Sequence, residues 1–192
     1  MEYAISIKKL TKKFGNFTAV DDLSFDIPKG KIFGFLGPNG SGKSTTIRMI
    51  CGVLKPTSGE GKVLGYDLIK ESEKIKQNIG YMSQKFSLYE DLTVEENLEF
   101  YGNIYMIPKD KLEERKKELI EMANLRGKEK SLAGTLSGGW KQRLALGCSL
   151  IHKPSLLILD EPTAGVDPVS RREFWSTITN LVKGGITVLV TT

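Results

Sequence analysis

Apolar and polar residues alternate along the beginning of the chain, and this alternation predicts β-strands. Residues 3–10 and 17–27 place apolar side chains at about every second position, which is the spacing of a strand with one buried face. A turn-rich segment, residues 27–30, separates the second strand from residues 31–37, an apolar run that ends in glycine. We therefore expect three short strands in the first quarter of the chain.

The hydrophobic period then changes from that of a strand to that of a helix. Ile47, Ile50, Cys51 and Leu54 follow at spacings of i, i+3, i+4 and i+7, which places them on one face of a helix. Glycine and proline within residues 52–56 indicate its end. Residues 31–56 are therefore predicted to form a strand, a loop and a helix in succession.

Residues 84–133 are richer in charged, helix-forming side chains and predict a helical insertion. Thr93 and Glu96 have the spacing of a capping box, and Asp110 and Glu113 open a second helical stretch. The insertion is predicted to consist of helices packed beside the strands.

The last third of the chain returns to strands. Residues 155–160 and 186–190 are short, continuous apolar runs, as expected of strands buried on both faces of a parallel sheet. Pro168 is predicted to begin a helix between them, whose inner face carries Phe174, Ile178, Leu181 and Val182. These elements predict an α/β core interrupted by helices.

Composition excludes several classes of protein. A chain of 192 residues with 40% hydrophobic and 27% charged residues fits one globular domain rather than a disordered or fibrous chain. The net charge of +5 comes from scattered basic residues, so we expect no direct nucleic-acid binding. Cys51 and Cys148 lie in apolar helical patterns and are read as buried side chains in a reducing compartment. No apolar run approaches membrane-spanning length, and the N-terminus is not a signal peptide.

The loop between the predicted strand and helix has the pattern G-x-x-x-x-G-K-S, which binds nucleotide phosphates in this context. Its backbone N–H groups and the helix N-terminus attract phosphate, Lys43 reaches the β and γ phosphates, and Ser44 can ligate Mg²⁺. The alternative is a purely structural glycine loop. The candidate phosphate-binding residues are Gly37, Pro38, Asn39, Gly40, Ser41, Gly42, Lys43, Ser44 and Thr45.

An acidic pair ends the predicted strand at residues 155–160. Asp160 ends this strand, which is the position of the carboxylate that holds Mg²⁺ in nucleotide hydrolases with this loop. Glu161 follows at once and is placed to orient and polarise the attacking water. The alternative is that Glu161 only caps the segment before Pro162.

A second glycine-rich turn, LSGGWKQR, leads into another predicted helix. Ser137, Gly138 and Gly139 would expose backbone donors at its N-terminus, which is again an anion site. Because the first loop already encloses the phosphates of one nucleotide, we expect this second site to face a nucleotide held by another copy of the domain.

The ordered motifs GPNGSGKST, Gln84 within YMSQKFSLYEDLTV, LSGG, LLILDEP and AGVD resemble the nucleotide-binding domain of ABC transporters over essentially the whole chain. The resemblance implies that residues 137–139 contact the γ-phosphate bound by the partner protomer. It implies that Gln84 links the metal and water to the membrane-domain contact, and that Asp167 lies in a loop coupling the two sites. It also implies that Phe14 stacks on adenine.

Simpler roles remain open for the residues assigned by resemblance. Gln84 could be an ordinary polar loop residue, and Asp167 could only cap the helix that follows it. Phe14 could be a packing aromatic at the end of a strand, with Phe17 as a weaker stacking candidate.

The resemblance implies a P-loop NTPase (RecA-like) core with a mostly parallel sheet, an N-terminal antiparallel β part and a helical insertion. We expect one domain over residues 1–192, with its core in 1–84 and 154–192 and a helical subdomain at about 85–153.

Two features depart from the family. Trp140 replaces a common glutamine, and either adds apolar interface area or packs within its own subdomain. The family's histidine after the last predicted strand is not present, and His152 is in the wrong place for that role. We therefore expect a C-terminally truncated form that hydrolyses ATP weakly.

Within the family, the motifs look like those of the ATPases of ABC-2 type exporters, in particular the multidrug-resistance group. This implies an ATP- and Mg²⁺-dependent ATPase that pairs with a second nucleotide-binding domain, of like or unlike chain. It would dock on transmembrane permease subunits at the cytoplasmic face of the cell membrane. The competing interpretation is a soluble, non-transport ABC ATPase that acts on nucleic acid or ribosomes.

Overall fold

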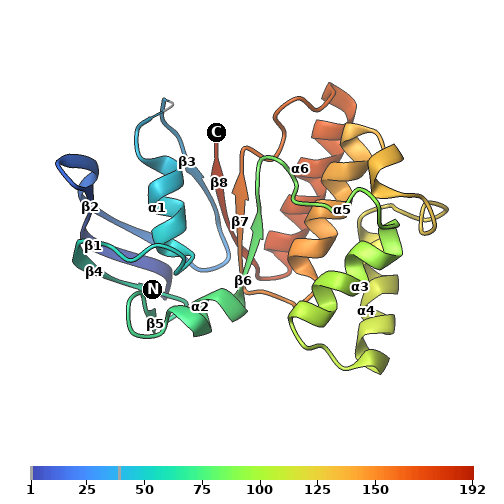
Figure 1. Ribbon diagram of the computed structural model, residues 1–192, viewed down its shortest axis with the longest axis horizontal. Coiled ribbons are helices and arrows are strands. Elements are labelled where there is room, and N and C mark those ends of the chain that lie inside the picture. Colours follow the sequence, from blue (N-terminus) through green and yellow to red (C-terminus); the bar gives the residue numbers. More distant parts are fainter. Residues whose placement is uncertain (1, 39) are drawn as a thin grey trace.

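The computed structural model describes residues 2–38 and 40–192, so the predicted role of Asn39 lies outside the described residues. The chain forms two sheets with a helix between them and a group of helices on the far side (Figure 1). This arrangement confirms the predicted α/β fold with an antiparallel N-terminal part and a mostly parallel core sheet.

The first sheet is antiparallel and has the strand order β2-β1-β4-β5. Its strands are β1 (Tyr3–Phe14), β2 (Phe17–Pro28), β4 (Ser58–Val63) and β5 (Tyr66–Asp67). The first two match the alternating segments of the sequence, although both are longer than expected. The pattern gave no sign of β4, because its sequence SGEGKV carries one apolar side chain.

The second sheet is parallel and has the strand order β3-β8-β7-β6. Its strands are β3 (Ile32–Phe35), β8 (Thr187–Thr191), β7 (Leu156–Asp160) and β6 (Ile79–Met82). Leu156, Ile158 and Leu189 belong to the hydrophobic cluster shared with the antiparallel sheet. Leu157, Leu159 and Val190 belong to the cluster shared with the helices on the other face. Burial on both faces explains the continuous apolar runs of β7 and β8.

The helices divide between the two faces of the parallel sheet. Helix α1 (Lys43–Ile50) lies on the side of the antiparallel sheet, whereas α5 (Gly138–Leu150) and α6 (Pro168–Lys183) lie on the opposite side (Figure 1). Helices α3 (Val94–Ile104) and α4 (Lys109–Met122) pack against α5. The short helix α2 (Ser72–Asn78) and a 3-10 turn (Ala133–Thr135) complete the helical elements of the described residues.

Two predicted helix starts agree with the structure, whereas α1 ends at Ile50, before the predicted face residue Leu54. Thr93 accepts a hydrogen bond from the Glu96 N–H, and the Glu96 carboxylate accepts one from the Thr93 N–H, which confirms the capping box. Asp167 caps α6, and Pro168 is its first residue. Cys51 and Cys148 are free and buried, and burial raises the pKa of Cys51 to about 12.

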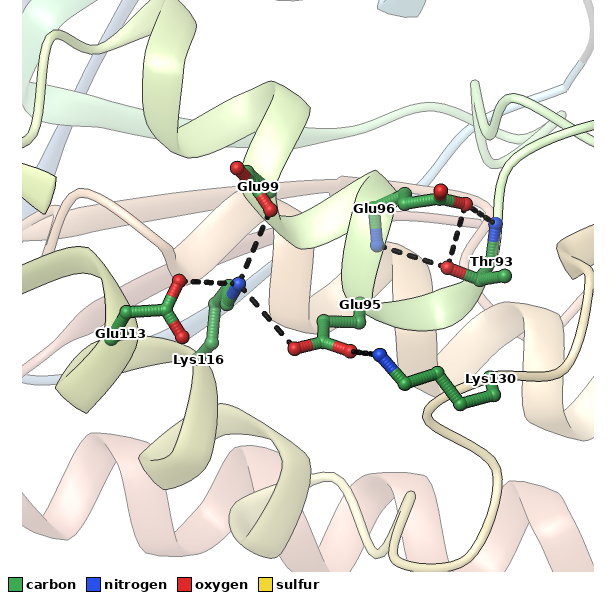
Figure 2. Close-up of polar contacts among 7 residues, drawn as sticks. All are labelled: Thr93, Glu95, Glu96, Glu99, Glu113, Lys116 and Lys130. Carbon is green, nitrogen blue, oxygen red and sulfur yellow. Dashed lines mark hydrogen bonds and ion pairs between the residues drawn. The ribbon is translucent and has the colours of Figure 1, made fainter.

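Lys116 joins α3 to α4 from a buried position. Its ammonium lies 2.7 Å from Glu113, 3.3 Å from Glu99 and 3.6 Å from Glu95 (Figure 2). Burial by itself lowers the pKa of this lysine, but the hydrogen bonds to Glu113 and Glu99 outweigh it and leave the pKa above its usual value. The cation therefore reduces the repulsion among three carboxylates, of which Glu95 also pairs with Lys130 at 2.5 Å.

We expect Lys116→Met to lower the free energy of unfolding by about 2 kcal/mol, because the three carboxylates lose their shared cation. Lys117→Met, at the neighbouring exposed lysine, is the matched control and should change stability by less than about 0.5 kcal/mol. Urea unfolding of both variants measures the difference. Equal losses in the two variants would show that the ion-pair cluster contributes little.

Candidate nucleotide site

The strand ends of the parallel sheet bring together residues that are far apart in the sequence. Phe35 of β3 pairs with Thr191 of β8, which in turn pairs with Asp160 of β7. Strand β6 pairs in parallel with β7, and Gln84 follows its end by two residues. The glycine loop, Asp160, Glu161 and Gln84 therefore all follow the carboxyl ends of parallel strands at one edge, where α/β sheets bind ligands.

The glycine loop curls tightly around the start of α1. Gly42 has a φ of 86°, and a Cβ at this position would lie 2.4 Å from the Ala19 carbonyl oxygen. Only glycine fits such a position without strain. Helix α1 begins at Lys43, so its first backbone N–H groups have no acceptor within the helix and point out of its N-terminus. This is the geometry expected of a phosphate-binding loop.

Lys43 is buried and folds back over its own loop. Its ammonium donates hydrogen bonds to the carbonyl oxygens of Gly37 and Pro38, the latter at 3.1 Å. Both acceptors are backbone groups that an anion could replace. Ser44 is exposed and Thr45 is half-buried in the first turn of α1, so their hydroxyls stand at the same helix start.

Asp160 is held through both of its carboxylate oxygens. Thr191 donates from its hydroxyl to Oδ1 at 2.5 Å, and Tyr81 donates to Oδ2 at 3.3 Å. Burial and the charge of Asp160 raise the pKa of Tyr81, so the phenol keeps its proton and remains a donor. Asp160 therefore has a fixed orientation at the strand end.

Glu161 and Gln84 meet directly. The Gln84 side-chain amide donates to the Glu161 carboxylate over 2.8 Å. Glu161 has a φ of 47°, which is unusual for a residue other than glycine, and its N–H bonds to Thr191. The turn at Glu161 directs its side chain toward the segment after β6, so two residues predicted separately become one cluster. The carboxylate of Glu161 contacts Gln84, and its role toward the attacking water stays a prediction.

These side chains have the donor chemistry that Mg²⁺ prefers. The hydroxyl of Ser44, the carboxylate of Asp160 and the amide of Gln84 are all oxygen donors, and Mg²⁺ in nucleotide sites is bound by one or two such groups together with phosphates and water. No cluster of three His, Cys, Asp or Glu side chains suited to a metal occurs in the part of the chain that the structure describes. The residues present thus fit a metal held jointly with a nucleotide.

The second glycine turn lies elsewhere. Ser137 is the N-cap of α5 but makes no side-chain capping bond, and Gly138 is exposed. A Cβ on Gly139 would lie 2.5 Å from the Ser170 hydroxyl oxygen, so α5 meets the start of α6 closely here. Since α5 and α1 lie on opposite sides of the parallel sheet (Figure 1), this turn does not complete the loop of its own chain.

Asp167 has the capping role that was the simpler of its two interpretations. Its carboxylate accepts hydrogen bonds from the N–H groups of Ser170, at 2.9 Å, and Val169, at 3.0 Å. The bonds from Ser170 and Val169 lower the pKa of Asp167. A role in coupling two sites remains a separate hypothesis.

Trp140 packs within its own chain. Its ring contacts the helical hydrophobic cluster, with Arg143 5.0 Å and Lys128 5.9 Å from the ring centroid. Arg143 also pairs with Glu173 of α6. The tryptophan therefore stabilises the junction of α5 and α6 in the single chain, which is one of the two roles expected for it.

Phe14 and Phe17 face each other across the β1–β2 turn and are 49% and 65% exposed. The Lys12 ammonium lies 5.1 Å from the centroid of Phe14. Phe14 is the last residue of β1 and its ring is partly open to solvent, so stacking on adenine and packing at the strand end both stay predictions.

His152 lies away from the strand-end cluster. Its Nε2 is 2.9 Å from the Ile79 carbonyl oxygen, at the amino end of β6, and its ring stacks on Tyr105. Burial lowers the pKa of His152 to about 4, so it is neutral at pH 7. Its position agrees with the expectation that it has no contact with the phosphates.

Sequence reasoning missed three residues that organise the site. Tyr81 and Thr191 bind Asp160, and the buried Gln142 donates from its side-chain amide to the Pro162 carbonyl oxygen at 2.5 Å. Each stands in or next to a recognised motif, but the roles of Tyr81 and Thr191 depend on strand pairing, and that of Gln142 depends on where α5 meets the loop after β7.

Comparison with known proteins shows the family to which the chain is similar. The ABC transporter family model matches residues 20–164. The chain is 52% identical over 191 residues to the "Probable multidrug ABC transporter ATP-binding protein YbhF" of Escherichia coli (strain K12), covering 100% of this chain and 33% of that protein. It is 43% identical to the "Linearmycin resistance ATP-binding protein LnrL" of Bacillus subtilis (strain 168), covering 97% of this chain and 60% of that protein. The chain thus spans between a third and three fifths of the length of these two relatives.

A solved structure has the same fold. The structure of cbiO1 from Clostridium perfringens, described as part of the ABC transporter complex cbiONQ, superposes with a TM-score of 0.90 at 28% identity. The match covers 100% of this chain and 79% of that one. With the family model covering most of the chain and the glycine loop, Asp160 and Glu161 assembled at one sheet edge, we conclude that this chain belongs to the ABC transporter family of ATP-binding proteins.

Proposed function

We propose that this chain binds and hydrolyses ATP in order to power an ABC-2 type exporter. The observation that carries the proposal is the placement of the glycine loop, Asp160, Glu161 and Gln84 at neighbouring ends of one parallel sheet. Such a site binds a nucleoside triphosphate and presents a carboxylate to its terminal phosphate.

The residues divide the work of hydrolysis. Lys43 would leave its backbone acceptors and bind the β and γ phosphates, while the N–H groups at the start of α1 hold the remaining phosphate oxygens. Ser44, Asp160 and Gln84 would hold Mg²⁺, which supplies charge neutralisation at the phosphates when bound. Glu161 would orient water for in-line attack and accept its proton, assisted by the hydrogen bond from Gln84.

A second copy, or an unlike nucleotide-binding subunit, would complete the site. The LSGG turn stands on the opposite side of the sheet from α1, so it is available to a nucleotide bound by another protomer (Figure 1). In the closed pair, Ser137, Gly138 and Gly139 would meet the γ-phosphate held by the partner. Asp167 stands beside Gly139 and is placed to connect the two sites, and Phe14 would stack on adenine.

Partners in the membrane would dock on the helical side. No helix in residues 2–38 and 40–192 is long and apolar enough to cross a bilayer. A groove of about 880 Å³ lies beside the α3–α4 connection and includes Tyr105, the 81% exposed Met106 and His152. A second groove shares Tyr105 with it and is lined by Tyr81, which bonds Asp160. A permease segment in these grooves would therefore touch a side chain that reaches the nucleotide site.

The similarity to multidrug and linearmycin resistance proteins favours export of drugs or other small hydrophobic molecules. We further propose that residues 85–153 form a helical subdomain, and that residues 1–84 and 154–192 form the core. Gln84 stands at their junction and would transmit the state of the nucleotide to the membrane subunits.

A groove variant tests where the membrane partner docks. Met106→Glu replaces the exposed apolar side chain of this groove with a carboxylate and should lower recovery of the full-length protein with membranes by about tenfold, or 1.4 kcal/mol. Its affinity for ATP should not change, because Met106 lies outside the strand-end site. Ile69→Glu, at an apolar residue with 41% exposure on the loop after β5, is the matched control and should leave both properties unchanged.

Cell fractionation distinguishes the alternatives. Recovery of the wild-type protein with ribosomes rather than membranes would contradict the exporter assignment and favour the soluble ABC ATPase. Equal membrane recovery of wild type and Met106→Glu would contradict only the docking groove.

A further inference from the structure

Thr191 lies between the two acidic residues of the nucleotide site. It is the last residue of β8, and its side chain is fully buried. Its hydroxyl donates to Asp160 Oδ1 over 2.5 Å and accepts from the Glu161 N–H over 3.1 Å. Because an N–H can only donate and a hydroxyl has one proton to give, the hydrogen bonds run in one direction, from Glu161 through Thr191 to Asp160.

We infer that Thr191 is a positioning residue for the Mg·ATP site, whose hydroxyl orients the Asp160 carboxylate and holds the turn at Glu161. The inference rests on the proposed function, since it assigns the carboxylates their roles toward metal and water. Because Thr191 is fully buried, it would act through Asp160 and Glu161 rather than by direct contact with nucleotide or metal.

The geometry at each neighbour supports this role. The Thr191 bond to Asp160 is shorter than the 3.3 Å bond from Tyr81 on the other oxygen, so Thr191 is the closer of the two donors that limit rotation of the carboxylate. Glu161 has a φ of 47°, a left-handed conformation that is unfavourable for a residue other than glycine. Its N–H bonds to both the hydroxyl and the carbonyl oxygen of Thr191, which offsets that cost.

Thr187 provides a matched control in the same strand. It is also buried, at 1% exposure, and its hydroxyl accepts a hydrogen bond from the Gly30 N–H at 2.9 Å. It stands at the opposite end of β8 from Asp160. Loss of the hydroxyl removes one buried hydrogen bond at Thr187 and two at Thr191, and only the loss at Thr191 affects the acidic residues.

The experiment measures binding of ATP to the full-length protein at increasing Mg²⁺, and in EDTA, alongside turnover. Thr191→Val keeps the shape of the side chain and removes the hydroxyl, and Thr191→Ser keeps the hydroxyl. We expect Thr191→Val to need about tenfold more Mg²⁺ for the metal-dependent gain in ATP affinity, and to lose about 10–100-fold in turnover. Affinity in EDTA should be unchanged. Thr191→Ser should stay within about threefold of wild type, and Thr187→Val should keep the wild-type Mg²⁺ requirement.

Other outcomes overturn the inference. An unchanged Mg²⁺ requirement in Thr191→Val would do so, and so would equal defects in Thr191→Val and Thr191→Ser. If Thr191→Val and Thr191→Ala both fail to fold while Thr187→Val folds, the hydroxyl serves stability alone and the inference fails. A wild-type protein that shows no gain in ATP affinity from Mg²⁺ would contradict the proposed site itself, which separates that failure from this one.

Discussion

Lys43→Ala is expected to weaken binding of Mg·ATP by about 100-fold, which corresponds to about 2.7 kcal/mol. In the structure the ammonium of Lys43 already lies inside the glycine loop, bonded to the carbonyl oxygens of Gly37 and Pro38. A triphosphate entering the loop offers charged acceptors in place of neutral ones, and charge-assisted hydrogen bonds are about twice as strong. The lysine therefore contributes mainly to the bound state.

Calorimetric titration of the full-length protein with Mg·ATP measures this loss. Lys31→Ala is the matched control, because Lys31 is an exposed lysine next to β3, before the strand rather than after it. The control should bind as the wild type does. Unchanged affinity in Lys43→Ala would contradict the assignment of the loop to phosphate binding.

The glycine loop, Asp160 and Glu161 could be predicted from sequence because each is set by local rules. A loop between an apolar strand and an amphipathic helix must present its backbone N–H groups at the helix start, whatever the rest of the fold does. The continuous apolar runs of β7 and β8 likewise predicted strands that are buried on both faces, because such a run is a local feature of the sequence. Local spacing was also enough to place the Thr93 and Glu96 capping box.

What the sequence did not reveal depends on partners distant in the chain. Thr191 is one of two adjacent threonines, and only the pairing of β8 with β7 places its hydroxyl beside Asp160, 31 positions away. Tyr81 is 79 positions from Asp160 and belongs to β6, a strand of four residues with no clear pattern. Trp140 was left open between two roles, since its contact with Lys128 depends on how the loop before α5 folds back over the helix, whereas Arg143 lies one turn along the same helix.

The largest effect on catalysis is expected from a substitution at Glu161. Glu161→Gln should bind Mg·ATP as the wild type does and lose turnover by about 100–1,000-fold, because an amide cannot accept the proton of the attacking water. The substitution preserves size and still offers Gln84 an oxygen acceptor, so the contact at 2.8 Å can persist. Single-turnover hydrolysis measures the loss, and normal turnover would assign the proton to another group.

A protein that binds ATP without hydrolysing it should also accumulate in the closed state. We expect light scattering on full-length Glu161→Gln to show a doubled mass with Mg·ATP and a single-chain mass without it. This follows from the placement of α5, whose N-terminal turn holds Ser137, Gly138 and Gly139, on the opposite side of the parallel sheet from α1 (Figure 1), so that a γ-phosphate would reach this turn from a second protomer. Gly138→Asp in the same background is the control. It places a carboxylate at an exposed turn where phosphate would bind, and it should keep ATP affinity while abolishing the doubling of mass.

A dimer of Glu161→Gln with Mg·ATP would show that Trp140 is tolerated at the closing surface. A single-chain mass at saturating Mg·ATP would contradict closure by nucleotide alone and require the membrane partner to hold the two copies together.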